Sequence, residues 1–236
     1  MQDLKAILEK ILEKRLRSYN CRNSPNNSSV LGALKTAVDR GEMSEADLRD
    51  EILTLFFAGH DTTAMALCFC LKILKNSSKW HSRLIEKMDD PEGDALLNAF
   101  VSECLRLYPP VWSIARRCLV SKDYSELKIT NDDLVVIPTW ALQRSEKYFK
   151  DASEFNPERW LDSNFVDGLS RVAYLPFGFG PRICIGSRLA IVELKTILKS
   201  ILKNSSWIAF SKTTDSEEPD LGRLPVKAGL TLRLNL

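Results

Sequence analysis

The chain has 236 residues, of which 44% are hydrophobic and 27% charged, and 33 Lys and Arg against 31 Asp and Glu give a net charge of +2. This length suffices for one substantial domain with a packed core. The near balance of charge argues against a nucleic-acid partner. The six cysteines form no CxxC pair, so we expect reduced thiols in an intracellular chain rather than disulfides or a structural zinc site. They are Cys21, Cys68, Cys70, Cys104, Cys118 and Cys184.

Neither the first ten residues nor the most apolar stretch of the chain indicates a membrane segment. The first ten residues, MQDLKAILEK, carry charges throughout and do not resemble a signal peptide. The stretch 52–74 is largely apolar, but residues 60–63 (HDTT) interrupt it at the centre, where a charge is most costly in a bilayer. We therefore expect a buried helix there, and no membrane anchor in this chain.

Apolar residues recur at helical spacing over most of the chain. The predicted helices span 4–16, 30–38, 45–75, 80–88, 95–107 and the region from just after Cys184 to about residue 202. The sequence SEAD at 44–47 resembles a capping box before the longest helix. Residues 19–29 (YNCRNSPNNSS) read as a polar loop.

The pattern changes between residues 111 and 138, where short apolar runs alternate with polar turns. Strands are predicted at 119–120, 127–129 and 134–137, and the tail at 229–234 is also strand-like. Residues 150–175 have no clear period, and a loop of that length indicates a functional role. The expected fold is mainly α with small β-sheets.

The stretch FGFGPRICIG places Cys184 where a tight turn leads into a helix. Unpaired N–H groups and the positive end of the dipole at a helix N-terminus stabilise a thiolate. Gly180 and Gly186 allow the backbone to approach the sulfur or a flat ligand. The guanidinium of Arg182 suits a carboxylate, and Phe177 suits a flat ring. This combination fits an iron porphyrin whose metal is held by the cysteine sulfur.

The five fixed positions of F-x-x-G-x-R-x-C-x-G occur by chance in a chain of this length with a probability of about 10⁻⁵ to 10⁻⁴. The plain alternative is a buried, inert cysteine at a helix cap. With this motif the chain resembles the cytochromes P450, the haem-thiolate monooxygenases. The resemblance implies haem b (iron protoporphyrin IX) bound through the Cys184 thiolate. The residues implied to surround it are Phe177, Gly178, Gly180, Arg182 and Gly186.

A second motif, AGHDTT at 58–63, matches the A/G-G-x-D/E-T-T pattern of that family. Taken alone, these weak helix-forming residues favour a plainer reading, in which the threonine bonds back to a helix carbonyl beside an aspartate with a local bond. By resemblance, Gly59 opens space above the porphyrin and Thr62 donates a hydrogen bond to O2. Asp61 relays protons toward it, as a general acid does.

Glu103 and Arg106 lie three residues apart and share a helix face, although such a pair is usually a surface ion pair. By resemblance, ECLR at 103–106 is the family's E-x-x-R, and PERW at 157–160 is its P-E-R-F with tryptophan in place of phenylalanine. Arg159 then completes a buried triad that supports the haem-side loop, a structural role. Arg116 is expected to contact a haem propionate, with Arg117 as the competing choice.

The resemblance implies an oxidoreductase that inserts one oxygen atom from O2 into an apolar small-molecule substrate. Electrons would come from a reductase or a ferredoxin. Candidate substrate contacts, besides a hairpin near 221–226, are Phe56, Phe57, Ala58, Val111 and Ile114.

The chain departs from the family in length, because family members are typically about twice this size. Residues 1–236 would then form a partial domain without the N-terminal half, which carries the membrane anchor in eukaryotic relatives. The alternatives are a non-catalytic remnant that binds haem weakly, or a haem-thiolate isomerase or peroxygenase that needs no reductase. The intact Asp61–Thr62 pair argues against the latter. Gln143 stands where relatives often have histidine.

Overall fold

The computed structural model describes residues 10–11, 13–14, 29–124 and 126–203. Most of the predicted helix 4–16 and nearly all of the loop 19–29 lie outside the described residues, as do the hairpin 221–226 and the strand 229–234 entirely. The chain forms two compact units, residues 1–61 and residues 62–236.

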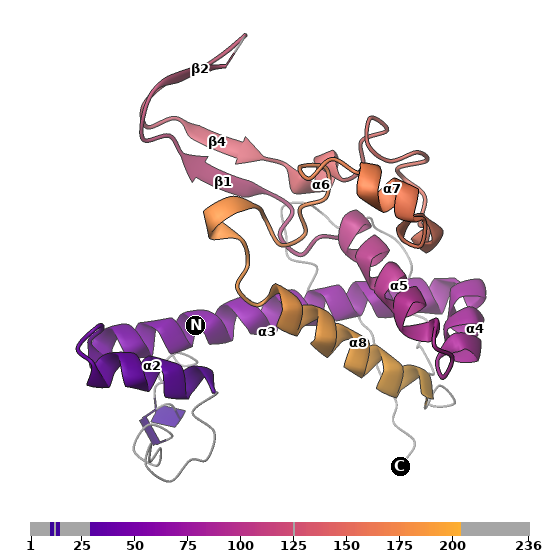
Figure 1. Ribbon diagram of the computed structural model, residues 1–236, viewed down its shortest axis with the longest axis horizontal. Coiled ribbons are helices and arrows are strands. Elements are labelled where there is room, and N and C mark those ends of the chain that lie inside the picture. The colour runs from indigo at the N-terminus through magenta and orange to yellow at the C-terminus, as the bar shows by residue number, and fades with distance from the viewer. Residues whose placement is uncertain (1–9, 12, 15–28, 125, 204–236) are drawn as a thin grey trace. The chain divides into compact units, whose positions relative to one another are not determined.

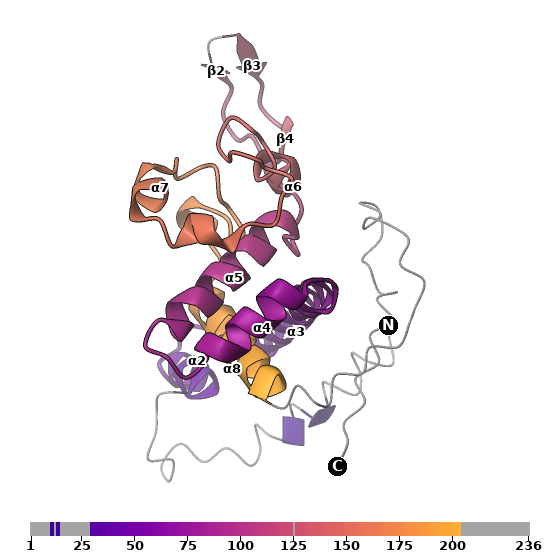
Figure 2. The same cartoon turned by 90° about the vertical axis from the view of Figure 1, so that its right-hand side faces the viewer.

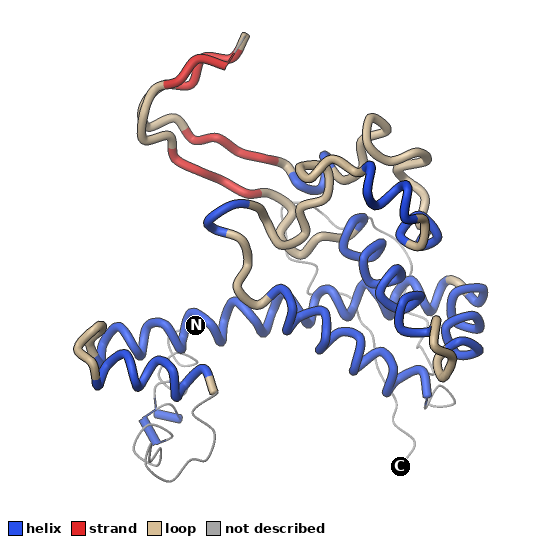
Figure 3. Tube along the Cα trace, viewed as in Figure 1, coloured by secondary structure: helices blue, strands red, loops and turns tan. Residues whose placement is uncertain are grey.

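Helices make up most of the described structure (Figures 1 and 3). The helices are α2 (Val30–Asp39), α3 (Glu45–Asn76), α4 (Ser78–Lys87), α5 (Gly93–Leu107), α6 (Thr139–Leu142), α7 (Ser163–Gly168) and α8 (Ser187–Lys203). The five long helices that were predicted in this region are confirmed to within about two residues. Short 3₁₀ turns, η1 (Pro157–Trp160) and η2 (Gly180–Arg182), were not predicted, nor were the short helices α6 and α7.

The start of α3 is set by the predicted capping box. The hydroxyl of Ser44 accepts a hydrogen bond from the N–H of Asp47 at 3.1 Å, and the Asp47 carboxylate accepts the N–H of Ser44 at 2.9 Å. These reciprocal bonds satisfy donors that a helix end otherwise leaves unpaired. They also hold the pKa of Asp47 below its ordinary value, through the Ser44 hydroxyl first and the Ser44 amide second.

Within the described residues, α3 is also a helix that could cross a membrane by length and composition alone, with a mean hydropathy of 1.4 over its most apolar window. Only 6% of that window is buried inside the chain. The expectation of a buried helix therefore holds only for part of α3, because little of this window is buried while Ala66, Cys70, Leu71 and Leu74 of the same helix are buried.

Two small antiparallel sheets precede α6. Strand β1 (Ile114–Arg117) pairs with β4 (Leu134–Ile137), and β2 (Lys122–Tyr124) pairs with β3 (Leu127–Ile129). The β2–β3 hairpin extends away from the helices (Figure 2). The strands predicted at 127–129 and 134–137 are confirmed, but 119–120 is wrong, because those residues form an exposed bend. Strands β1 and β2 were missed because they are rich in charged residues, and their pairing comes from a neighbouring strand.

The main core of residues 62–203 lies where α4, α5 and α8 meet the second half of α3. Leucines 194, 198 and 202 form the buried stripe of α8, at the spacing of one helix face. Cys70 and Cys104 belong to this core, and burial raises the pKa of the Cys104 thiol well above its ordinary value. These two thiols are packing groups in the core.

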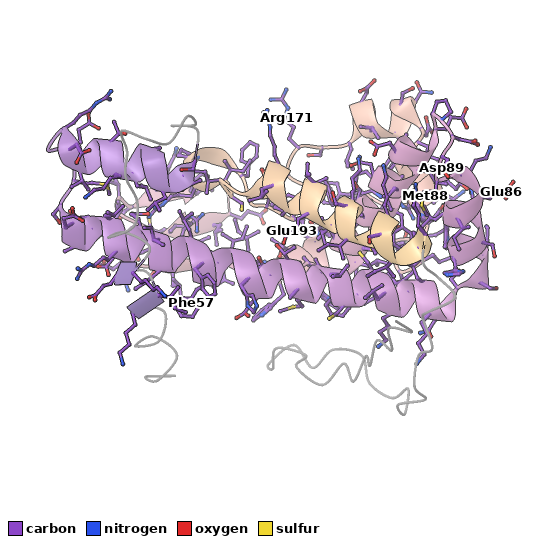
Figure 4. The ribbon with its side chains drawn as sticks, turned by 90° about the horizontal axis from the view of Figure 1, so that it is seen from below. Phe57, Glu86, Met88, Asp89, Arg171 and Glu193 are labelled. Atoms are coloured by element: carbon purple, nitrogen blue, oxygen red, sulfur yellow. The ribbon has the colours of Figure 1, made fainter. Side chains whose placement is uncertain are left out.

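Charged side chains tie α8 to the start of α5. Lys195 Nζ lies 2.7 Å and Lys199 Nζ 3.0 Å from the Asp94 carboxylate, and Lys203 Nζ lies 2.9 Å from that of Asp89, labelled in Figure 4. The hydrogen bonds from Lys195 and then Lys199 hold the pKa of Asp94 below its ordinary value of 3.8. A carboxylate with a lowered pKa stabilises the fold above its unfolded pKa, and this contribution is lost as the pH falls through the folded pKa.

We expect Asp94→Asn to lower the free energy of unfolding at pH 7 by about 0.5 kcal/mol, because the Asp94 side chain is 61% exposed and solvent screens the pair. The difference from the unmodified chain should be constant above about pH 5 and should shrink as the pH falls below 3.8. Urea titrations at several pH values measure it. A difference that stays the same at the lowest pH would contradict this account of the pair.

Candidate functional site

The loop of residues 177–186, here called the cysteine loop, is closed by backbone hydrogen bonds. The N–H of Cys184 donates to the carbonyl of Phe177 at 2.9 Å, and the N–H of Ile183 donates to the carbonyl of Gly180 at 3.0 Å. Gly178 and Gly180 have φ values of 78° and 75°, a conformation that side chains disfavour. The two glycines are therefore required by the turn that presents Cys184.

Cys184 lies three residues before α8 begins at Ser187, rather than at the helix end itself. The first turn of α8 instead donates to the carbonyls of Cys184 and Gly186, from Ser187 at 3.4 Å and from Ala190 at 2.9 Å. Residues 185 and 186 form a turn between Cys184 and α8, and the Cys184 side chain is exposed. Cys184 therefore lies where a tight turn leads into a helix, as its sequence predicts.

The sulfur of Cys184 is open to a ligand. Its side chain is exposed and carries a free thiol. A Cβ on Gly186 would lie 3.9 Å from the sulfur, while one on Gly180 would meet nothing within 4 Å. Three apolar side chains on the same loop, Phe179, Ile183 and Ile185, are also exposed, the last by 89%. Exposed apolar side chains on the same loop as an exposed thiol are typical of a ligand-binding site.

The structure separates the two candidate arginines of β1. A Cβ on Gly178 would lie 3.8 Å from Cδ1 of Ile114, so this face of β1 lies against the cysteine loop. Side chains alternate along a strand, so Arg116 shares the face of Ile114 and Arg117 does not. Arg117 instead lies 3.7 Å from the Asp132 carboxylate. Both arginines are exposed, as is Arg182, which ends the turn η2.

The carboxylate of Glu103 is fully buried and accepts five hydrogen bonds. Arg106 supplies two of them in a bidentate pair, from Nε and Nη2, each at 2.8 Å. The others come from Arg159 Nε at 3.2 Å, from the N–H of Asn156 at 2.8 Å and from Trp160 Nε1 at 2.8 Å. The tryptophan that replaces the family's phenylalanine therefore adds a donor to this carboxylate. Sequence reasoning had assigned no role to Trp160.

The AGHDTT motif lies in mid-helix on α3, and its residues fall on both sides of the boundary between the two compact units. A Cβ on Gly59 would meet nothing within 4 Å. The ring of His60 lies 2.9 Å from the Asp61 carboxylate and is stacked on Phe56. Both side chains are exposed, as are those of Phe56 and Phe57.

Comparison with known proteins identifies the family. The Cytochrome P450 family model matches residues 1–232. The chain belongs to the cytochrome P450 family. It is 37% identical over 194 residues to Cytochrome P450 4V2 of Homo sapiens, covering 74% of this chain and 36% of that protein. It is 36% identical over 187 residues to Cytochrome P450 4ae1 of Drosophila melanogaster, covering 72% and 37%, and 30% identical over 221 residues to Cytochrome P450 72A15 of Arabidopsis thaliana, covering 87% and 43%.

The chain therefore spans less than half the length of these curated relatives. Membership of the cytochrome P450 family implies a haem cofactor, and the surroundings of Cys184 fit one. In the part of the chain that the structure describes, no three His, Cys, Asp or Glu side chains are grouped to hold a metal ion.

Proposed function

We propose that this chain is the haem-binding, carboxyl-terminal part of a cytochrome P450 monooxygenase domain and that Cys184 is its haem ligand. The observation that carries the proposal is the cysteine loop. It presents an exposed thiol together with two left-handed glycines, Gly178 and Gly180, a glycine at 186 whose added Cβ would lie 3.9 Å from the sulfur, and three exposed apolar side chains. The same loop carries the full motif by which the family is recognised.

When bound, haem supplies the redox chemistry by which one atom of O2 is inserted into an apolar substrate with electrons from a reductase or ferredoxin. The chain's own residues hold and orient it. The thiolate of Cys184 would bind the haem iron, and Gly178 and Gly180 keep the loop in its turn. Arg182 and Arg116 would offer guanidinium groups to the haem propionates. Phe177, whose carbonyl fixes the Cys184 amide, would pack beside the ring.

The residues of α3 would act on the oxygen side. Gly59 leaves room, since a side chain there meets no neighbour within 4 Å. Asp61, exposed and paired with His60, would hold and pass a proton, and the hydroxyl of Thr62 would donate a hydrogen bond to O2. The apolar substrate would contact Phe56, Phe57, Ala58, Val111 and Ile114.

A partial domain also accounts for the exposed apolar face of α8. Leu189 and Val192 are 71% and 60% exposed, on the opposite side of the helix from the buried leucines. Surface of this kind is normally covered by protein or ligand. We propose that the rest of the family domain covers it, in the same or in another polypeptide. Without that cover, water would reach the site and weaken its electrostatics.

The test is the absorbance of the chain after addition of haem, reduction and exposure to CO. Co-expression with the first half of a related cytochrome P450 domain provides the covered form. A strongly red-shifted Soret band supports a thiolate-held haem, and substrate oxidation that requires an electron donor then supports a monooxygenase. Product formed without a donor would favour an isomerase or peroxygenase. Absence of the red-shifted band in both forms would contradict the proposal and favour a non-catalytic remnant.

A further inference from the structure

Gln143 is a fully buried side chain whose amide makes three hydrogen bonds to backbone. Its Nε2 donates to the carbonyls of Leu105 at 3.1 Å and Arg106 at 2.9 Å. Its Oε1 accepts the N–H of Leu175 at 2.7 Å. Both hydrogens of Nε2 and one lone pair of Oε1 are thus bonded to main-chain partners.

The two carbonyls belong to the last turn of α5, which ends at Leu107. Carbonyls in the last turn of a helix have no partner within the helix, and they are costly to bury unpaired. Gln143 follows α6 and satisfies two of them at once. The amide therefore joins the end of α5 to the residues that follow α6.

The third bond leads to the cysteine loop through a continuous series of backbone groups. Leu175, held by Gln143, accepts the N–H of Gly178 at 3.1 Å. The carbonyl of Phe177, the residue before Gly178, accepts the N–H of Cys184 at 2.9 Å. Leu175 is thus fixed on one side to the rigid helix α5 and on the other to the turn that carries the sulfur.

We propose that Gln143 is a positioning residue for Cys184: its amide fixes the entry to the cysteine loop against the end of α5 and so sets where the sulfur lies. The proposal rests on the proposed function in one respect: the sulfur that Gln143 positions is the proposed haem ligand. The hydrogen bonds by which Gln143 holds the loop are present in the haem-free chain as well. Gln143 touches neither haem nor substrate in this role.

The variant Gln143→Met keeps the length of the side chain and removes all three hydrogen bonds. The control Leu84→Ala opens the core on α4 without touching this network. In the haem-free chain, amide hydrogen exchange at Leu175, Gly178 and Cys184 should rise about tenfold in Gln143→Met beyond any rise in Leu84→Ala. Equal exchange in the two variants would overturn the proposal.

A partial rescue keeps the test informative if Gln143→Met fails to fold. Neutral histidine offers one donor and one acceptor, so Gln143→His can hold Leu175 and one carbonyl. If Gln143→Met folds, the exchange rate of the Gly178 amide in Gln143→His should lie between the rate in the unmodified chain and the rate in Gln143→Met, after the rise seen in Leu84→Ala is subtracted from the latter. If Gln143→Met is unfolded, the rate in Gln143→His should lie near that of the unmodified chain. Exchange in Gln143→His as fast as in an unfolded chain would contradict the proposal.

The haem-loaded readout separates this inference from the proposed function. If the unmodified chain gives the red-shifted CO band, a larger fraction of the haem should lack the red shift in Gln143→Met than in Leu84→Ala. If the unmodified chain gives no such band, the proposed function fails while the exchange data still decide the role of Gln143. An unchanged share of the red-shifted band in Gln143→Met would overturn the positioning role.

Discussion

Replacing Arg106 by methionine should lower the free energy of unfolding by about 3–5 kcal/mol, because it breaks a buried ion pair and leaves the partner charge in the core. Arg106 is fully buried, and its guanidinium uses all five N–H groups. Two bind Glu103, and the other three bind the carbonyls of Gln143, Ala152 and Glu154 at 2.8, 2.6 and 2.9 Å.

The loss would be spread over the whole segment that leads to the cysteine loop. Without Arg106, three carbonyls between residues 143 and 154 lose their donor, and each unpaired buried group costs about 1–3 kcal/mol if water does not replace the bond. Arg106→Lys should recover only part of the stability, since an ammonium has three donors and cannot make the planar bidentate pair. Chemical denaturation of the three proteins measures the order.

Arg83→Met is the matched control. Arg83 also pairs with a glutamate, Glu158, but both side chains are partly exposed, so the expected loss is below about 1 kcal/mol. If Arg106→Met and Arg83→Met cost the same, the buried network does not support this part of the fold. If Arg106→Met alone is severe, the triad is the structural support that the family resemblance implied.

Cys184→Ser should abolish the red-shifted CO band completely while leaving the free energy of unfolding within about 0.5 kcal/mol of its original value. The thiol is exposed and packs against little, so its loss opens no cavity. A serine hydroxyl does not ionise at neutral pH and cannot replace a thiolate as the ligand of haem iron. Loss of the band without loss of the fold is the expected signature of a ligand.

Cys118→Ser controls for the change from sulfur to oxygen. Cys118 lies between β1 and the bend that follows, and its thiol donates to the carbonyl of Val120 at 3.0 Å, a bond that serine can also make. The band should survive in this variant. A red-shifted band that persists in Cys184→Ser, or that disappears equally in Cys118→Ser, would contradict the assignment of Cys184.

The sequence by itself determined the five long helices of the described region, the capping box and the family. These features are local: helical periodicity over 45–75, a serine and an aspartate three residues apart, and five fixed positions around Cys184 can each be read without knowing what lies nearby in space. The mainly helical fold with small β-sheets followed from the same patterns, whereas their antiparallel pairing is known only from the structure. The charged strands β1 and β2 escaped because their pairing, rather than their own composition, makes them strands.

Only the tertiary structure decided which polar side chains act together. Nothing local joins Gln143 to Leu105 and Leu175, which are 38 and 32 residues away, or Trp160 to Glu103, 57 residues away. The face that Arg116 shares with Ile114, and the ion pair that occupies Arg117, likewise depend on β-strand pairing and on the turn that brings Asp132 near. A buried hydrogen bond needs a partner at a set distance and angle, and folding alone brings residues so far apart in sequence to that geometry.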